Sequence, residues 1–307
     1  MTDRVIRGLA LDGRARAYAA DTTETMRELQ RRHGTFPVAT AALGRTITAG
    51  AIMGAMLKGE ERLTVRIKGD GPIGQIVVDA GADGVVRGYV DNPHVDLPPN
   101  DRGKLDVRGA VGEGSLYVVK DLGLKDPYVG SVPLVSGEIA EDVTYYFAKS
   151  EQTPSAVALG VLVDTDGSVR VSGGFVLQLM PGIAEEDIAG IERKLEELGS
   201  VTEKLDREVP LVDLMRELVP SFTALDELPV TFRCRCSRAR IDSTLIGLGR
   251  EELESMLAEQ GGAEVICHFC SERYVYDAGD LRRLIARIDG GGAGGEEPET
   301  GETKMES

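Results

Sequence analysis

The chain has 307 residues, of which 42% are apolar, and its formal net charge at pH 7 is −16. This length and composition predict one large or two modest domains with a hydrophobic core. The strong negative charge repels phosphate backbones, so it disfavours general nucleic-acid binding. The N-terminus shows no basic region that leads into an apolar run with a cleavage site, so we expect a cytoplasmic protein.

The first elements predicted are a hairpin and a helix. Residues 4–20 contain two strand-like segments around an Asp-Gly turn at 12–13, which is typical of a β-hairpin. Thr22 or Thr23 is then expected to cap a helix that runs to about His33.

The next segment, Val38–Leu57, is apolar and long enough to resemble a membrane span. It contains Arg45 and several threonines, is rich in alanine and glycine, and is the one such segment in the sequence. We therefore predict a buried helix that begins after Pro37, in a protein that does not enter a membrane.

From Leu63 onward apolar residues alternate with polar ones, as in half-buried strands. The segment "GDGPIG" matches the dinucleotide-binding Gly-x-Gly-x-x-Gly pattern, but strand-like residues follow it instead of a helix, so we predict a hairpin turn. A helix is predicted at 138–149, and short strands at 63–69, 73–80, 84–90, 104–111, 114–122, 155–163 and 168–180. This mixture predicts an α+β core domain over residues 1–181, in which helices pack on antiparallel sheets.

Residues 182–231 carry much charge and few large apolar side chains. Helical spacing predicts one helix that ends at Gly199 and another between Pro210 and Pro220. Such helices are marginally stable alone, so we interpret this segment as a metastable helical linker. The Gly- and Glu-rich tail at 290–307 is predicted to be disordered.

Two close cysteine pairs follow this linker, and they contain every cysteine of the chain: Cys234, Cys236, Cys267 and Cys270. In the cytosol such pairs favour metal or redox chemistry over a structural disulfide framework. Four thiolates form the tetrahedral ligand set of structural Zn²⁺, and a helix predicted between the pairs lets the chain fold back. The sequence therefore predicts a zinc module over residues 232–289. His268 is an alternative ligand that a site filled by four thiolates does not need.

Arginines surround the first cysteine pair, at positions 233, 235, 238 and 240. Their charge could keep the thiolates deprotonated and offset the excess negative charge of a Cys₄ zinc site. They could equally lie on a solvated strand or loop edge, or contact a nucleic acid, although the acids nearby weaken that last interpretation.

The cysteine spacing also permits oxidation. Either pair could close a disulfide, and each disulfide would remove two metal ligands. Because the binding free energy of zinc in small modules is also folding free energy, oxidation would unfold this one. A thioredoxin-like oxidoreductase would need a βαβ context, which is missing here, and no acid/base set indicates another enzyme. A zinc-stabilised RNA- or ribosome-binding module is the alternative function.

The cysteine pairs and many other segments resemble the redox-regulated 33 kDa bacterial heat-shock chaperone family (33 kDa chaperonin, heat shock protein 33). The similarity runs to about residue 288 and leaves the tail as an extra. It includes "PVATAALGR", "GAMLKGEERLTVRIKGDGPIG", "VVKDLGLKDPYVG", "VSGEIAEDVTYYFAKSEQTPSAVALGVLV" and "GGFVLQLMPG".

This resemblance implies an ATP-independent holdase that is not an enzyme and takes part in the response to oxidative stress. It implies that the reduced form binds Zn²⁺ and is inactive, and that oxidation pairs Cys234 with Cys236 and Cys267 with Cys270. Zinc release would then unfold the C-terminal module and the linker, so that apolar surface binds unfolding client proteins. The resemblance also implies a homodimer in the active state.

Overall fold

The computed structural model describes residues 2–290 of the chain. These residues divide into two compact units, and the chain passes from one to the other between Cys234 and Arg235. Each unit encloses buried apolar side chains of its own. The tail predicted at 290–307 lies, apart from Gly290, outside the described residues.

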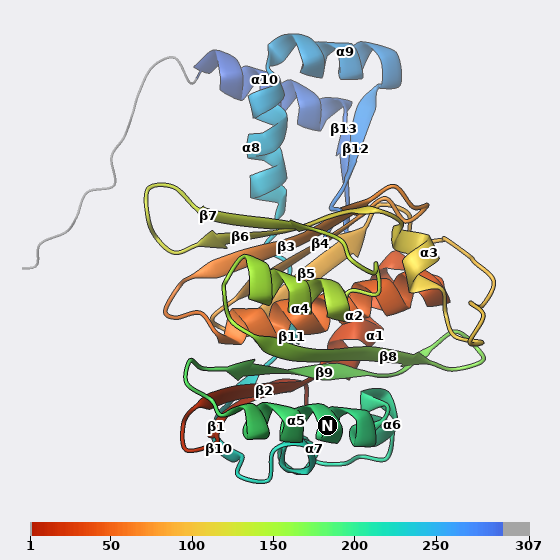
Figure 1. Ribbon diagram of the computed structural model, residues 1–307. Coiled ribbons are helices and arrows are strands. Elements are labelled where there is room, and N and C mark those ends of the chain that lie inside the picture. Colours follow the sequence, from red (N-terminus) through yellow and green to blue (C-terminus); the bar gives the residue numbers. More distant parts are fainter. Residues whose placement is uncertain (1, 291–307) are drawn as a thin grey trace, which may run out of the picture. The chain divides into compact units, whose positions relative to one another are not determined.

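A sheet formed around the N-terminal hairpin is the first layer of the first unit (Figure 1). Its strands lie in the order β10–β1–β2–β9–β8, and the pairings described between them are antiparallel. The predicted hairpin is confirmed, since β1 and β2 flank a turn that contains Asp12 and Gly13. The bounds are β1 Arg4–Ala10, β2 Ala15–Asp21, β8 Ser155–Val163, β9 Val169–Leu179 and β10 Thr223–Pro229.

The second sheet has the strand order β11–β5–β4–β3–β6–β7. The two-residue strand β11 adds to β5 in parallel, and the other pairings described in this sheet are antiparallel. Lys68 pairs with Gln75 across the "GDGPIG" segment, so the predicted hairpin turn is confirmed. The bounds are β3 Arg62–Gly69, β4 Gln75–Gly81, β5 Val85–Val90, β6 Gly114–Asp121, β7 Tyr128–Pro133 and β11 Thr231–Phe232.

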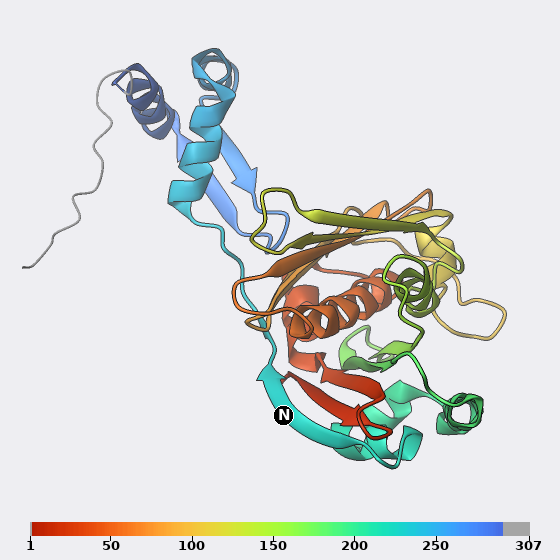
Figure 2. The ribbon, with the colours of Figure 1, turned by 60° about the vertical axis from the view of Figure 1, so that its left-hand side comes forward.

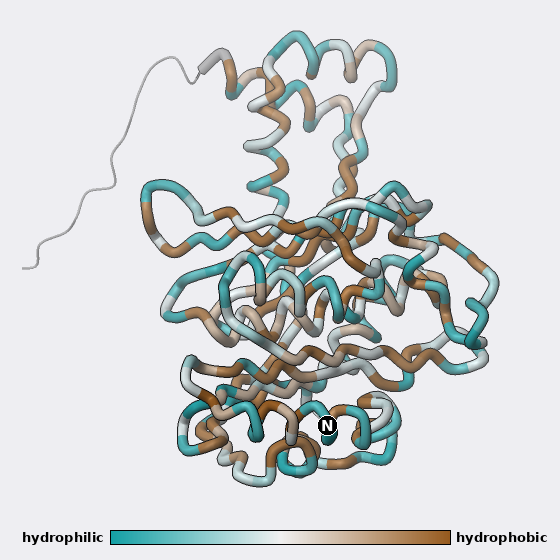
Figure 3. The backbone as a smooth tube through the Cα atoms, viewed as in Figure 1, coloured by the Kyte–Doolittle hydropathy of each residue, from teal (hydrophilic) through white to brown (hydrophobic). Residues whose placement is uncertain are grey.

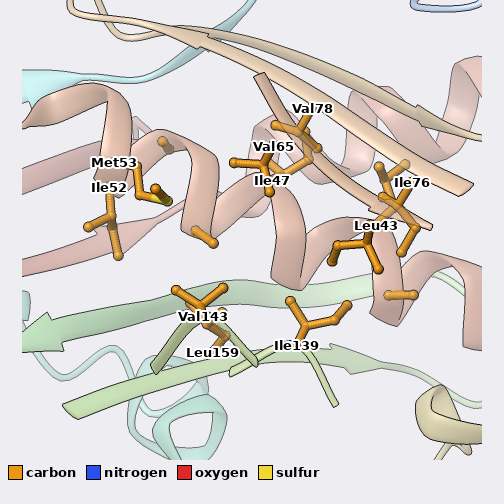
Figure 4. Close-up of a cluster of buried hydrophobic side chains, with 14 of the residues drawn as sticks. Leu43, Ile47, Ile52, Met53, Val65, Ile76, Val78, Ile139, Val143 and Leu159 are labelled. Carbon is orange, nitrogen blue, oxygen red and sulfur yellow. The ribbon is translucent and has the colours of Figure 1, made fainter. Parts of the chain in front are cut away.

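Helix α2 (Pro37–Ala55) lies between the two sheets and contacts both. Figure 4 shows Ile47 close to Val65 and Val78 of the second sheet, with Leu159 on the opposite side of the helix. The helix has the length and apolarity of a membrane span, but 94% of its most apolar window is buried within the described structure. The prediction of a buried core helix is therefore confirmed.

Helix α1 (Thr23–His33) begins with a cap that the sequence predicts only in part. Thr22 occupies the N-cap position as predicted. Its hydroxyl, however, is hydrogen-bonded to the hydroxyls of Thr48 and Ser172 and accepts no hydrogen bond from the helix N–H groups. The carboxylate of Asp3 accepts hydrogen bonds from the backbone N–H groups of Glu24 and Thr25, at 2.9 and 2.5 Å. The cap of α1 thus comes from the residue just before strand β1.

Replacing Asp3 by alanine should lower the free energy of unfolding by about 1–2 kcal/mol, because two N–H groups at a helix N-terminus lose their acceptor. Urea unfolding followed by circular dichroism measures this change. Glu60→Ala, an exposed position in the loop before β3, is the control and should leave the urea midpoint unchanged. An Asp3→Ala midpoint equal to that of the wild type would mean that the cap contributes nothing.

The strand predicted at 104–111 is wrong, since this segment contains helix α3 (Val107–Val111). The Asp106 side chain accepts from the N–H of Gly109 and starts the turn. Val107, Ala110 and Val111 are buried, at the i, i+3 and i+4 spacing of a helix. A short apolar run does not distinguish the two periods, so the capping aspartate was the informative signal.

The residues after β9 form three helices, α5 (Glu185–Leu198), α6 (Val201–Asp206) and α7 (Leu211–Leu218). They cover the face of the first sheet that points away from α2 (Figure 1). Teal and brown alternate along them in Figure 3, because one side of each helix is polar. Their apolar side chains share a buried cluster with β1, β2 and β9, to which the helices contribute Ile191, Leu198, Val201, Leu205, Leu211, Leu214, Met215 and Leu218.

The second unit is built from helices and one hairpin. Its elements are α8 (Arg238–Leu248), α9 (Arg250–Gln260), β12 (Gly262–Ile266), β13 (Arg273–Asp277) and α10 (Ala278–Gly290). Figure 2 shows the antiparallel hairpin β12–β13 beside the three helices. Its buried apolar core is small within the described residues and consists of Leu245, Leu253, Tyr276, Leu281, Leu284 and Ile285.

Candidate metal centre

The two cysteine pairs occupy two different kinds of backbone. Cys234 and Cys236 lie in the segment without regular secondary structure between β11 and α8. Cys267 and Cys270 lie in the turn of the β12–β13 hairpin. In this turn the N–H groups of Cys270 and Ser271 donate to the carbonyl of Cys267, at 3.3 and 2.8 Å. Ser271 has a φ of +56°, which lets the chain reverse directly after the last cysteine.

The four Sγ atoms lie within 4.8 Å of one another. Cys236 Sγ and Cys270 Sγ are 3.3 Å apart, and none of the four cysteines is in a disulfide. A tetrahedral ion with metal–sulfur distances of about 2.3 Å requires sulfur–sulfur separations of about 3.8 Å. This value lies between the 3.3 Å separation of Cys236 and Cys270 and the 4.8 Å limit within which all four sulfurs lie, so the four side chains fit one tetrahedral ion.

The set of ligand atoms consists of sulfur alone. The four cysteines that the sequence singles out come together, and His268, which lies between two of them, does not belong to the group. Cys270 is buried and 3% exposed, whereas the other three thiols are half-buried. Soft thiolate donors in a tetrahedral arrangement select zinc, Cu(I) or iron–sulfur chemistry over Mg²⁺ and Ca²⁺.

A tyrosine of the hairpin contacts this cluster. The hydroxyl of Tyr274, on β13, donates to Cys236 Sγ at 3.2 Å. This hydrogen bond, together with burial and the charge of the nearby thiolates, raises the pKa of Tyr274 well above its usual value. The phenol therefore stays protonated at neutral pH and remains a donor to the sulfur.

An arginine from the core sheet contacts the first cysteine. Arg87 lies on β5, next to strand β11, and its Nη1 is 4.0 Å from Cys234 Sγ. Its Nε and Nη2 donate to one carboxylate oxygen of Asp79 on β4, at 3.0 and 2.7 Å. Asp79 thus orients a positive charge toward the sulfur, in the way that second-layer groups orient metal ligands.

Two of the arginines near the first cysteine pair, Arg238 and Arg240, have structural contacts in the second unit. Arg238 donates to the carbonyl of Val275 and to Asp280, and its guanidinium lies 4.2 Å from the ring centroid of Tyr276. Arg240 donates to the carbonyl of Arg235 at 3.1 Å. The contacts of Arg238 connect α8 to the hairpin and to α10, which the sequence could not indicate.

The sequence therefore predicts the ligand set but misses the polar groups next to it. Tyr274 carries a weak signal, since it is four residues after Cys270 on the inward-facing side of a strand. Arg87 carries none, because it is 147 residues away from Cys234 and reaches it only through the pairing of β5 with β11.

The chain is similar to known proteins along most of its length. A family model described as "Hsp33 protein" matches residues 3–277. A protein named 33 kDa chaperonin from Geobacillus kaustophilus is 53% identical over 92% of this chain and 98% of its own length. A namesake from Desulforamulus reducens is 50% identical over 94% and 99%. A crystal structure of the 33 kDa chaperonin of Thermotoga maritima matches with a TM-score of 0.89, at 39% identity, over 94% of this chain and 100% of that one.

Proposed function

This chain belongs to the Hsp33 family of chaperones, and from that membership we propose that it is a redox-regulated, ATP-independent holdase. In this proposal Cys234, Cys236, Cys267 and Cys270 hold one Zn²⁺ while the protein is reduced and inactive. Peroxide oxidises the thiols, the site releases its ion, and the protein then binds unfolding clients and prevents their aggregation.

The observation that supports this proposal is the convergence of four sulfurs within 4.8 Å, three of them from the second unit, whose described apolar core is small. When bound, zinc supplies the binding free energy that a core of this size lacks, about 10 kcal/mol or more in small zinc modules. The four cysteines would hold it through their thiolates, and Tyr274 and Arg87 would stabilise the negative charge of the sulfurs.

The redox step uses a hydroperoxide as the oxidant. A cysteine thiolate attacks one peroxide oxygen, so that an S–O bond forms, the O–O bond breaks and hydroxide leaves. The neighbouring thiolate of the same pair attacks this sulfenic acid, which forms the S–S bond and releases a second hydroxide. Two thiolates thus lose two electrons to one peroxide. We propose the pairs Cys234–Cys236 and Cys267–Cys270, as the resemblance to the family implies; one residue separates the first two partners and two residues separate the others.

We further propose that the chain works in three parts. Residues 232–289 are the redox-switch module, 182–231 the metastable linker and 1–181 the core domain. The linker helices expose a polar side and bury apolar side chains against the first sheet. Their departure would uncover an apolar sheet face, which is the type of surface that binds unfolded chains.

The remaining properties follow from the same proposal. The protein would act in the cytoplasm, as a homodimer when active, with unfolded proteins as clients and without catalysing a reaction. Its charge of −16 opposes the alternative of an RNA- or ribosome-binding module.

The test compares the reduced, zinc-loaded protein with the same protein after treatment with peroxide. Light scattering follows the aggregation of a heat-unfolded client with each form at equal concentration. We expect the oxidised form to suppress aggregation and the reduced form to leave it unchanged. Equal protection by both forms would refute redox regulation, and protection by neither would refute the holdase assignment.

A further inference from the structure

We propose that Tyr274 sets the rate at which the cysteine cluster reacts with peroxide, by donating its hydroxyl hydrogen to Cys236 Sγ. This inference rests on the proposed redox function and assigns a positioning residue to it. Tyr274 is not a ligand in this proposal, and the expected effect of its loss is therefore on reactivity and not on zinc stoichiometry.

The contact is built into the hairpin. In β13 every second residue points inward, so Tyr274 and Tyr276 share one side of the strand while Arg273, Val275 and Asp277 are exposed. Tyr274 pairs with Val265 of β12, which places it at the cysteine end of the hairpin. Its ring is half-buried against the apolar core of the second unit, which limits the movement of its hydroxyl.

Tyr276, two residues further along β13, has a different partner. The hydroxyl of Tyr276 donates to Asp242 on α8 at 2.8 Å. The two phenols thus lie on the same side of β13, but one contacts a sulfur and the other a carboxylate. The chain therefore offers a matched pair of positions, since the same substitution at each removes one hydroxyl hydrogen bond from the same strand.

The expected direction follows from the chemistry of the attack on peroxide. The nucleophile is the sulfur lone pair, and negative charge moves from sulfur to the departing oxygen as the S–O bond forms. A donor on sulfur stabilises the charged thiolate more than the transition state, so it slows the reaction. Hydrogen bonds to the sulfur atoms of metal–thiolate centres tune the electron density of those centres in the same sense.

The location of Cys236 explains why a slower reaction of this thiol with peroxide would slow oxidation of the cluster. Its sulfur lies 3.3 Å from that of Cys270, which is nearly inaccessible to solvent. A hydroperoxide therefore meets the half-buried thiols first, and Cys236 is one of these. A slower attack at Cys236 delays the formation of the Cys234–Cys236 disulfide, which would remove two of the four ligands.

The experiment uses the full-length, reduced, zinc-loaded protein and measures two rates with a colorimetric zinc indicator. One rate is zinc release after addition of hydrogen peroxide, and the other is zinc release to a chelator without oxidant. We expect Tyr274→Phe to keep the wild-type zinc content. We expect its peroxide-driven rate, divided by its chelator-driven rate, to rise on the order of three- to tenfold.

Tyr276→Phe is the control, because it removes a buried hydroxyl contact that does not reach a sulfur. If this substitution only loosens the second unit, zinc should be released faster both to hydrogen peroxide and to the chelator. The ratio of the two rates should then stay at the wild-type value. As a second readout, the thiolate-to-metal absorption of the Co²⁺-substituted protein should shift in Tyr274→Phe and not in Tyr276→Phe.

The outcomes separate this inference from the proposed function. If the wild type retains its zinc in peroxide, the redox function itself is refuted. If the wild type releases zinc and Tyr274→Phe has an unchanged ratio of rates, the role of Tyr274 is refuted while the redox function stands. An equal rise of the ratio in Tyr276→Phe would also overturn the role of Tyr274.

Discussion

Replacing Cys267 by serine is expected to abolish stable zinc binding and to unfold the second unit. A neutral serine hydroxyl does not replace a thiolate, so three sulfurs would remain for an ion that takes four ligands in structural sites. Zinc in small modules contributes about 10–16 kcal/mol to folding, whereas the total stability of a domain is about 5–15 kcal/mol. The described apolar core of this unit consists of a few side chains and cannot offset such a loss. Zinc content per chain and hydrogen exchange of residues 235–290 measure both effects.

The matched control is Val275→Ser, on the same hairpin. Val275 is 61% exposed, so this variant introduces a serine without disturbing the core or the cysteine cluster. It should keep full zinc content and wild-type exchange. Full zinc content in Cys267→Ser would contradict the four-cysteine site, and a protected second unit without zinc would contradict the structural role of the metal.

Truncating Leu214 should release the linker helices and give the reduced protein holdase activity. Leu214 lies on α7, is 1% exposed, and packs in the cluster that joins the helices to β1, β2 and β9. A buried Leu→Ala substitution costs about 2–5 kcal/mol. Helix α7 has eight residues, so it depends on this packing more than on its intrinsic helix propensity. Limited proteolysis within 182–218 and client aggregation without oxidant measure the effect.

Arg216→Ala provides the control, since this side chain is exposed on the same helix. It should leave both proteolysis and the inactivity of the reduced protein unchanged. If reduced Leu214→Ala becomes sensitive to protease and still fails to protect the client, the exposed sheet face is not the client site. If it stays resistant, the linker is more stable than the proposal requires.

Most of the core could be predicted because its signals are local. The alternation along β3 and the Asp-Gly turn of the first hairpin indicate antiparallel strands from a few neighbouring residues. The small residues and Arg45 of α2 distinguish a core helix from a membrane span. The ligand set could also be predicted from local sequence, because two pairs of closely spaced cysteines supply the four ligands of a tetrahedral site.

The parts that the sequence did not reveal depend on residues far apart. Strand β10 is mostly exposed and lacks an apolar alternation; it forms by pairing its main chain with β1. The cap of α1 comes from Asp3, and its acceptor role exists only after the first sheet has formed. The contact of Arg87 with Cys234 likewise requires β11 to join β5. Side-chain contacts of this kind follow from tertiary pairing and not from local period.

The central claim is that an ion held by four sulfurs keeps the second unit folded. The direct measurement is hydrogen exchange of residues 235–290 in the reduced wild type, before and after zinc is removed by a chelator, with the zinc content determined in parallel. We predict about one zinc per chain at the start, and loss of protection throughout these residues once it is removed. A reduced protein that contains no metal and still protects these residues would contradict the account.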